Sequence, residues 1–175
     1  MAGPQTQGLE RGRFDDRPAK VLIVVSPYYR DIADQLLQGA RAEIEAWGAI
    51  HETAEVPGAL EIPSAIAVAA RLGQFHAFVA LGCVIRGETG HYDIVAGESA
   101  RALMDLGLVR RLPIGNGILT VETVEQAWAR ARVADMNKGG GAAAAALSVL
   151  RATAALAAAR PAPATGFLAG AFARG

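Results

Sequence analysis

The sequence predicts an α/β fold, a three-layer sandwich in which helices flank a four-stranded parallel sheet on both faces. The main observation is that short apolar runs rich in β-branched residues alternate with helical segments of ten or more residues. Strands joined in this way form right-handed βαβ units, which produce a parallel sheet between two helical layers. With 175 residues, of which 52% are hydrophobic and 19% charged, the chain has the size and composition of one globular domain.

The first strand is predicted at residues 20–26, because KVLIVVS is a continuous apolar run typical of a strand buried on both faces. Apolar residues at helical spacing predict a helix over residues 31–47, which Gly48 ends. A second strand, at residues 50–56, is more polar and is expected at an edge of the sheet. The helix predicted over residues 62–72 carries a proline in its first turn, where a backbone amide would have no partner.

The same alternation continues through the second half of the chain. Strands are predicted at residues 75–82 and 112–120. Helices are predicted at residues 92–106 and 123–133, the second with a threonine as its candidate N-cap. A last, alanine-rich helix follows a glycine run and extends to about residue 159, where two prolines end it.

The predicted domain covers residues 19–160, between two segments with little periodicity. Residues 1–18 are polar and are expected to form a flexible N-terminal arm without a secretory signal, and residues 161–175 form a C-terminal tail rich in glycine and alanine. The most apolar stretch, residues 142–159, is mostly alanine and contains Arg151. We therefore expect it to pack against protein and not to span a membrane.

Charge and cysteine content exclude several classes of partner. Lysines plus arginines number 17 and so do the acids, so no global field exists to hold nucleic acid or an anionic membrane. A single cysteine excludes an internal disulfide framework and fits a reducing, cytoplasmic location. With one cysteine and three scattered histidines, no transition-metal site is expected.

Ligands of parallel α/β sheets bind beyond the carboxyl ends of the strands, so the loops after the four strands are expected to converge on a site. The most informative of them lies in GCVIRGETGHYD, residues 82–93. Its residues Gly87, Thr89 and Gly90 can let backbone amides approach an anion at a helix N-terminus, and His91 can transfer a proton near neutral pH. The alternative is a capped turn with a surface histidine. The spacing matches neither a Walker loop nor a dinucleotide fingerprint.

Other segments also admit two interpretations. Glu61, in VPGALEIP, either complements a helix dipole or meets a polar ligand. The two tyrosines after the first strand either stack on a flat ring or pack locally. Arg130 is either a solvated helix residue or a bidentate phosphate ligand. Cys83 is expected to be a buried, inert thiol.

Several of these segments together resemble the lumazine synthase family of riboflavin biosynthesis. VPGALEIP and VIRGETGHYD are highly specific as a pair, and the similarity covers roughly residues 20–150 in the family's order and spacing. The resemblance implies a flavodoxin-like α/β fold. The segments that carry it are VSPYY at 25–29, VPGALEIP at 56–63, residues 82–93, GNGILTVE at 115–122, EQAWAR at 125–130 and NKG at 137–139.

The resemblance also implies a transferase reaction. The family condenses 5-amino-6-(D-ribitylamino)uracil with 3,4-dihydroxy-2-butanone 4-phosphate, releases phosphate and water, and forms 6,7-dimethyl-8-ribityllumazine without a metal or organic cofactor. Its members assemble as pentamers, and some pack twelve pentamers into an icosahedral shell that can associate with riboflavin synthase. Because the active sites lie between subunits, Arg130 would reach the site of a neighbour.

Site roles follow from matching each position to the family's motifs. His91 matches the proton-transfer residue, and Lys138 matches a lysine near the site. The phosphate would be held by Glu88, Thr89 and Arg130. The pyrimidine and its ribityl chain would be held by Tyr28, Ala59, Leu60, Glu61, Cys83, Val84, Ile85 and Asn116.

Two positions depart from the commonest family pattern. Tyr28 replaces the more usual Phe or Trp and should still stack. Asn116 stands where many members place a phenylalanine over the substrate, and it can hydrogen-bond but covers a ring less well. A weakly active or inactive relative that binds flavin or lumazine, or forms shells, is therefore the alternative function. An unrelated flavodoxin-like signalling domain is a third hypothesis.

Overall fold

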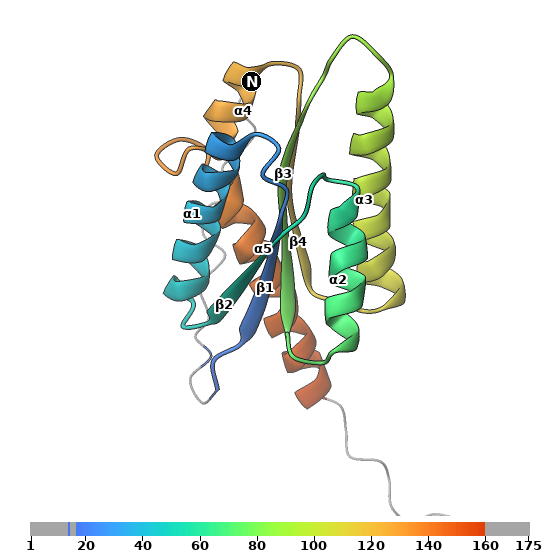
Figure 1. Cartoon of the computed structure of the whole chain (residues 1–175). Coiled ribbons are helices and arrows are strands. Elements are labelled where there is room, and N and C mark those ends of the chain that lie inside the picture. Colours follow the sequence, from blue (N-terminus) through green and yellow to red (C-terminus); the bar gives the residue numbers. More distant parts are fainter. Residues whose placement is uncertain (1–13, 15–16, 160–175) are drawn as a thin grey trace, which may run out of the picture.

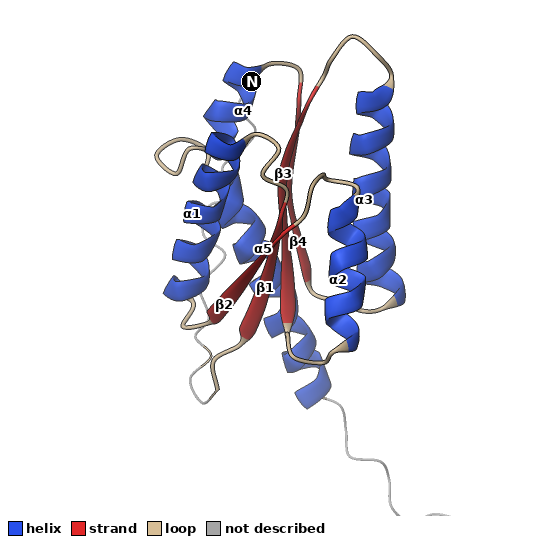
Figure 2. Cartoon of the chain, viewed as in Figure 1, coloured by secondary structure: helices blue, strands red, loops and turns tan. Residues whose placement is uncertain are grey.

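The computed structural model describes Phe14 and residues 17–159, and it confirms the predicted α/β fold class. All strand pairs are parallel, and the order across the sheet is β2-β1-β3-β4. Figures 1 and 2 show the sheet between two helical layers. In chain order the elements are β1 (Lys20–Val25), α1 (Arg30–Ala46), β2 (Ile50–Glu55), α2 (Glu61–Arg71), β3 (Ala77–Ile85), α3 (His91–Val109), β4 (Ile114–Val121), α4 (Val124–Ala131) and α5 (Lys138–Ala158).

The strand order explains which helices share a layer. The chain moves from β1 outward to β2, then back past β1 to β3 and on to β4. Because right-handed crossovers in opposite directions place their helices on opposite faces, α1 lies on one face, and α2 and α3 lie on the other. The last helices, α4 and α5, return to the α1 face (Figure 1).

The central strand β1 serves both layers through its side-chain alternation. Val21, Ile23 and Val25 belong to the core under α1, α4 and α5. Leu22 and Val24 belong to the core under α2 and α3. A strand buried on both faces reads as a continuous apolar run, which is why its prediction from sequence succeeded.

Small residues bring α5 close to its neighbours. A Cβ added at Gly139 would collide with the backbone of Leu36 in α1, and one added at Gly115 in β4 would collide with the backbone of Ala142 in α5. Asn137 adopts a left-handed conformation and accepts a hydrogen bond from the Gly140 amide, so it caps α5. The glycine run is therefore the first turn of this helix, one turn earlier than the sequence predicted.

The remaining boundaries differ from the predictions by up to three residues. Gly48 has a φ of +72° just beyond α1, as its predicted role as a stop requires. The side chain of Thr123 caps α4, as predicted. β3 extends to Ile85, three residues beyond the predicted end, because Cys83, Val84 and Ile85 continue the apolar run and pair with β4. α3 begins at His91, so this residue opens the helix and does not precede it.

The predicted arm and tail lie largely outside the described residues. Phe14, within the predicted arm, packs with its ring centroid 6.4 Å from that of Trp47. α5 is long and apolar enough to cross a membrane by length and composition, and 22% of its apolar window is buried. Much of this helix is therefore uncovered within one chain.

Candidate functional site

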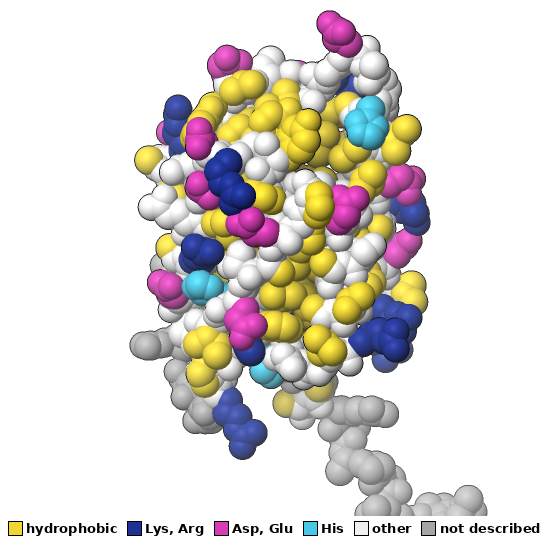
Figure 3. All heavy atoms as spheres, viewed as in Figure 1, with side chains coloured by type: hydrophobic (Ala, Val, Ile, Leu, Met, Phe, Trp, Pro, Cys, Tyr) yellow, Lys and Arg dark blue, Asp and Glu magenta, His cyan; other side chains and the backbone are white. Residues whose placement is uncertain are grey.

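A cavity of about 470 Å³ opens at the carboxyl edge of the sheet. Figure 3 shows hydrophobic side chains gathered near this end of the molecule, at the top of the view. The walls of the cavity come from the loops after β1, β2 and β3 and from the start of α3. The loop after β4 was also predicted to contribute, but it does not line the cavity, because β4 is an edge strand whose chain turns to the opposite helical layer.

The position of the cavity follows from the topology. The chain leaves β1 toward β2 on one side, whereas it enters β3 on the other side of β1. The connections therefore diverge above the β1–β3 pair and leave a crevice there. This switch point is where open α/β sheets bind small ligands.

Two hydrogen bonds fasten the first two loops to each other. The Ser26 hydroxyl donates to the Pro57 carbonyl at 3.3 Å, and the Val56 amide donates to the Val25 carbonyl at 2.9 Å. Both bonds link the end of β1 with the end of β2, so the aromatic residues after β1 stay beside the Gly58–Glu61 turn.

A guanidinium also joins these loops near the cavity. Arg30, the first residue of α1, donates to both carboxylate oxygens of Glu55 at 2.8 and 3.3 Å. The bond from Arg30 lowers the pKa of Glu55. The pair therefore stays charged near neutral pH and fixes the entry of α1 relative to β2.

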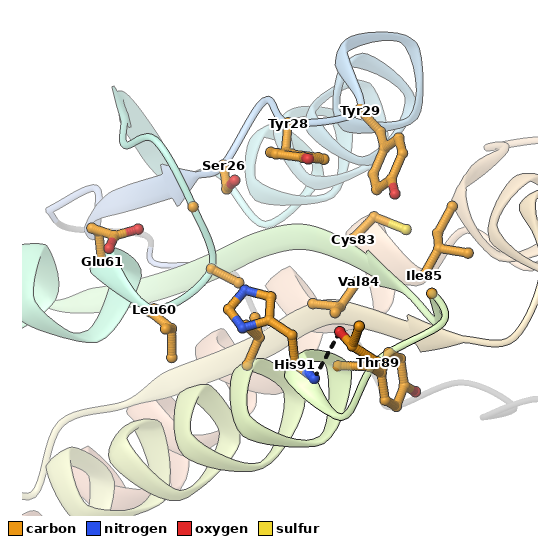
Figure 4. Close-up of a pocket in the computed structure, with 15 residues that line it drawn as sticks. Ser26, Tyr28, Tyr29, Leu60, Glu61, Cys83, Val84, Ile85, Thr89 and His91 are labelled. Atoms are coloured by element: carbon orange, nitrogen blue, oxygen red, sulfur yellow. Dashed lines mark hydrogen bonds between the residues drawn. The ribbon is translucent and has the colours of Figure 1, made fainter.

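Aromatic and polar side chains face the cavity from opposite walls. Figure 4 shows Tyr28 on one side and His91 on the other, with the β3 ribbon passing between them and Val84 beside the His91 ring. Tyr28 is 75% exposed, so much of its ring is open to a flat ligand. The cavity thus offers a stacking surface, an apolar floor and a titratable ring.

His91 sits where a helix supplies positive potential. It is the first residue of α3, and the N-cap residue of this helix, Gly90, has no side chain that could cap it. Its backbone amide donates to the Thr89 hydroxyl at 3.4 Å (Figure 4). The N-terminal end of the α3 dipole therefore points at the same loop that carries Thr89, which favours an anion there.

Cys83 and Tyr29 lie on the inner wall of the cavity, and burial keeps both side chains in their neutral, less reactive forms. Burial raises the pKa of the Cys83 thiol to about 11. Burial is also the main cause that raises the pKa of Tyr29, with the neighbouring Tyr28 and Cys83 adding to it. Both groups are therefore neutral near pH 7, and Cys83 is a wall residue and not a thiolate nucleophile.

The predicted site residues divide into two groups. Tyr28, Ala59, Leu60, Glu61, Cys83, Val84, Ile85, Thr89 and His91 all line the cavity. Glu88, Asn116, Arg130 and Lys138 do not line it within this chain.

The residues outside the cavity have defined surroundings. Asn116 is exposed on β4, and its side-chain oxygen accepts a hydrogen bond from the Ile118 amide at 3.0 Å. Arg130 lies half-buried in the last turn of α4 and donates to the Gln126 carbonyl at 3.0 Å. Lys138 opens α5 and is exposed. These three side chains therefore lie outside the cavity lining of this chain.

Several wall residues were not predicted as site residues. The sequence indicates Gly87 only as a residue that lets backbone amides approach an anion. It indicates Tyr29 only as one of two loop tyrosines that either stack on a flat ring or pack locally. Val95 lies in α3 four residues after His91 and three after Tyr92, so helical spacing could have revealed Val95 as a neighbour of both. The complete additional set is Ser26, Tyr29, Gly58, Gly87, Tyr92 and Val95.

Among the described residues, the side chains that could bind a metal ion lie apart from one another. Within Phe14 and residues 17–159, no group of three or more His, Cys, Asp or Glu side chains could hold a metal ion. The arrangement at the cavity instead suits a planar polar molecule and an anionic group, because an exposed aromatic ring and a helix N-terminus lie on its walls.

The fold and the cavity define a class of protein: an open parallel α/β sheet with a small-molecule site at its switch point. Residues 18–154 match the family model described as 6,7-dimethyl-8-ribityllumazine synthase. The chain belongs to this family, whose members are transferases of riboflavin biosynthesis, as the sequence predicted.

Named relatives support the same assignment. A protein of Methylorubrum extorquens (strain PA1) named 6,7-dimethyl-8-ribityllumazine synthase is 69% identical over 136 residues, which cover 75% of this chain and 79% of the relative. A protein of the same name from Methylobacterium nodulans is 62% identical over 166 residues, covering 90% and 92%. In Rhodopseudomonas palustris, 6,7-dimethyl-8-ribityllumazine synthase 1 is 57% identical over 146 residues, covering 81% and 90%.

Proposed function

We propose that this chain condenses 5-amino-6-(D-ribitylamino)uracil with 3,4-dihydroxy-2-butanone 4-phosphate and forms 6,7-dimethyl-8-ribityllumazine, phosphate and water. The observation that carries the proposal is that residues of both family-specific segments, VPGALEIP and VIRGETGHYD, line the same cavity. The two segments follow different strands, β2 and β3, and the topology of the sheet brings both to the same cavity. The family match supports the same reaction.

The pyrimidine substrate is assigned to the wall formed by Tyr28 and the end of β3. The exposed Tyr28 ring stacks on the flat pyrimidine, and the backbone of Cys83–Ile85 supplies hydrogen-bonding groups at its edge. The ribityl chain is assigned to Ala59–Glu61, because the Glu61 carboxylate can accept hydrogen bonds from hydroxyl groups.

The phosphate is assigned to the loop that ends at α3. Thr89 supplies a hydroxyl, and the backbone amides at the start of α3 supply further donors beside a positive helix end. Glu88 carries a negative side chain, so only its backbone suits a phosphate. Arg130 of a neighbouring subunit is proposed to add the cation, since Arg130 of the same chain does not line the cavity.

The chemistry needs positioning and proton transfer more than a protein nucleophile. The substrate amine adds to the ketone carbon, and water leaves as the imine forms. Loss of a carbon-bound proton and cleavage of the C–O bond expel the phosphate with its electron pair, which leaves an enol that becomes a ketone. The second amine adds to this carbonyl carbon, and a second water leaves as the ring closes. Holding the two substrates in register can supply much of the rate. His91 is proposed to give and take the protons of these steps from its position on the cavity wall. No metal or organic cofactor is proposed.

A homo-oligomer is proposed because large apolar side chains are uncovered in one chain. Exposed residues of α3 include Met104, Leu108 and Val109, and those of α5 include Val149 and Leu156. Uncovered apolar helix faces of this kind are typical of protein interfaces. We propose a cytoplasmic pentamer, with a shell of twelve pentamers and association with riboflavin synthase as its further assembly states, and without nucleic-acid or membrane partners.

One observation favours a second candidate, a ligand-binding or shell-forming relative with little catalysis. Asn116 is exposed and uses its side-chain oxygen to bind the Ile118 amide, so it offers no ring to cover a substrate. Under this alternative the assembly and the cavity remain, whereas turnover is lost.

The test mixes the purified full chain with both substrates and follows lumazine fluorescence together with phosphate release. Turnover with one phosphate released per lumazine supports the enzyme. Binding of added lumazine without turnover supports the second candidate. An absence of both would exclude both proposals. Reactions that lack either substrate are the matched controls.

A further inference from the structure

One side chain just outside the cavity joins three elements of its wall. Arg86, directly after β3, donates through Nη2 and Nη1 to the two Asp93 carboxylate oxygens at 2.8 and 3.2 Å. Its Nε lies 3.0 Å from a Glu122 oxygen at the end of β4. The guanidinium carbon also lies 4.0 Å from the centroid of the Tyr92 ring. Arg86 therefore links β3, the first turn of α3 and the end of β4.

The base of this contact is fixed by the sheet. The Arg86 amide donates to the Val121 carbonyl at 2.9 Å, which continues the β3–β4 pairing by one more hydrogen bond. Glu122 follows Val121 directly, so the sheet itself presents the Glu122 carboxylate to Arg86. While its Nε is at Glu122, the same guanidinium also holds Asp93 in the first turn of α3.

The loop held between these fixed ends has little packing of its own. A Cβ added at Gly87 or at Gly90 would meet no atom within 4 Å in the described structure. Both glycines also have φ values that any residue can adopt. The bond from the His91 amide to the Thr89 hydroxyl is long, at 3.4 Å. Such a loop takes its position from its ends.

Direct phosphate binding by Arg86 is the competing role, and its surroundings argue against it. Two carboxylates already engage the guanidinium and raise its pKa, and the bond from Arg86 lowers the pKa of Asp93. Arg86 does not line the cavity, whereas Gly87, Thr89 and Tyr92 do. Its positive charge is paired with the carboxylates of Asp93 and Glu122 and does not face a ligand in the cavity.

We propose that Arg86 is a positioning residue, which holds the Gly87–His91 loop and the Tyr92 ring in the geometry that the phosphate-bearing substrate requires. The inference rests on the proposed function. Exposed ion pairs contribute little to global stability, and the side chains of Arg86, Asp93 and Glu122 are 38%, 63% and 57% exposed. The effect of Arg86 is therefore expected in the loop and in catalysis, not in the unfolding of the protein.

The chain offers a matched control on the same helix. Arg101 also bridges two carboxylates, Glu98 at 2.8 Å and Asp105 at 2.6 Å, and its side chain is 61% exposed. It lies in α3 away from the cavity lining. Arg101→Gln thus removes a similar ion-pair network without touching the site.

The experiment measures kcat and both KM values for Arg86→Gln, Asp93→Asn, their double variant and Arg101→Gln. We expect each of the first two to lower kcat/KM for the butanone phosphate by on the order of ten- to a hundred-fold, since small displacements of positioned groups have effects of this size. The pyrimidine KM should change less. The double variant should lose no more than the larger single loss, because the two residues act as a unit. Arg101→Gln should match the wild type.

Asp93→Asn separates positioning from direct binding. If Arg86 were a phosphate ligand, removing the Asp93 charge would free it, and the KM for the butanone phosphate would stay unchanged or fall. An increase in this KM supports positioning, and an unchanged or lower value overturns it. Losses that add fully in the double variant would also overturn it.

Amide hydrogen exchange gives a readout that does not depend on activity. In Arg86→Gln the amides of residues 87–91 should exchange faster while those of β3 keep their protection, and Arg101→Gln should leave both unchanged. Unchanged exchange in the loop would overturn the inference. If the wild type forms no lumazine, the proposed function fails, whereas an active wild type with fully active Arg86 variants refutes the positioning role alone.

Discussion

Tyr28 and His91 face one cavity from opposite walls, one in the loop after β1 and the other at the first residue of α3 (Figure 4). The strands that carry these segments, β1 and β3, are direct neighbours in the sheet. A flat substrate that stacks on Tyr28 therefore presents its edge toward the floor formed by β3 and toward the imidazole. The proposed roles, ring binding by Tyr28 and proton transfer by His91, belong to different residues, so the two roles can be tested separately.

Replacement of Tyr28 tests ring binding. Tyr28→Phe should be nearly silent, because the stacking face remains. Tyr28→Ala should weaken pyrimidine binding by about 1–3 kcal/mol, the size of base–aromatic stacking in nucleic-acid complexes. The KM of each substrate, measured at saturation of the other, is the readout, and the butanone phosphate serves as the internal control. Equal pyrimidine affinity in the alanine variant would remove Tyr28 from the binding wall.

Replacement of His91 tests proton transfer. His91→Ala should lower kcat by on the order of 10²–10⁴-fold, the usual contribution of a general acid–base group, while pyrimidine binding changes little. His51→Ala is the control, because His51 lies 3.3 Å from Glu45 and away from the cavity. A turnover number that is unchanged at saturating substrates would exclude His91 from the mechanism.

Replacement of Arg130 tests the shared site. Arg130→Ala and Arg130→Lys should both raise the KM of the butanone phosphate more than that of the pyrimidine, because an ammonium does not reproduce a bidentate guanidinium. Arg132→Ala is the control, since the Arg132 guanidinium lies 5.1 Å from the Trp128 ring centroid on the same chain.

Mixed assemblies extend this test. Chains with Arg130→Ala and chains with His91→Ala, dissociated and reassembled together, should recover part of the activity, since some interfaces would join two intact halves. Activity equal to the sum of the two parents would show that Arg130 acts within its own subunit or not at all.

Two glycines in the first turn of α5 form a matched pair for stability. Gly139→Ala should destabilise the protein by about 1–3 kcal/mol, the usual range for overpacking, because its Cβ would collide with the Leu36 backbone. Gly141→Ala meets nothing within 4 Å and should stabilise the helix by roughly 0.4–1 kcal/mol. Urea unfolding measures both. Similar midpoints for the two variants would contradict the close contact between α1 and α5.

The fold could be predicted from sequence because each buried strand has a local signature. Val21–Val25 is apolar at every position, which only a strand covered on both faces requires. Boundaries were less predictable where tertiary pairing extends an element. β3 continues past Gly82 to Ile85, where the apolar residues end before Arg86, because Cys83, Val84 and Ile85 pair with β4.

The site was predictable where chemistry is local and hidden where it depends on assembly of distant residues. Thr89 and His91 lie in one recognisable segment. Tyr29 was ambiguous because only the fold shows that its ring reaches the wall beside Cys83. The contact of Arg86 with Glu122 depends on the β3–β4 register, which the sequence alone does not fix. The role proposed for Arg130 requires a second chain, which the sequence of one chain does not place.

The proposed formation of lumazine in the cavity above β1 and β3 is tested most directly by a structure of the assembled protein with 6,7-dimethyl-8-ribityllumazine and phosphate bound. We expect the bicyclic ring to stack on Tyr28 beside the end of β3, the ribityl chain to lie along Ala59–Glu61, and the phosphate to lie at Thr89 and the start of α3. Product ordered at any other surface, with this cavity unoccupied at saturating concentration, would contradict the account.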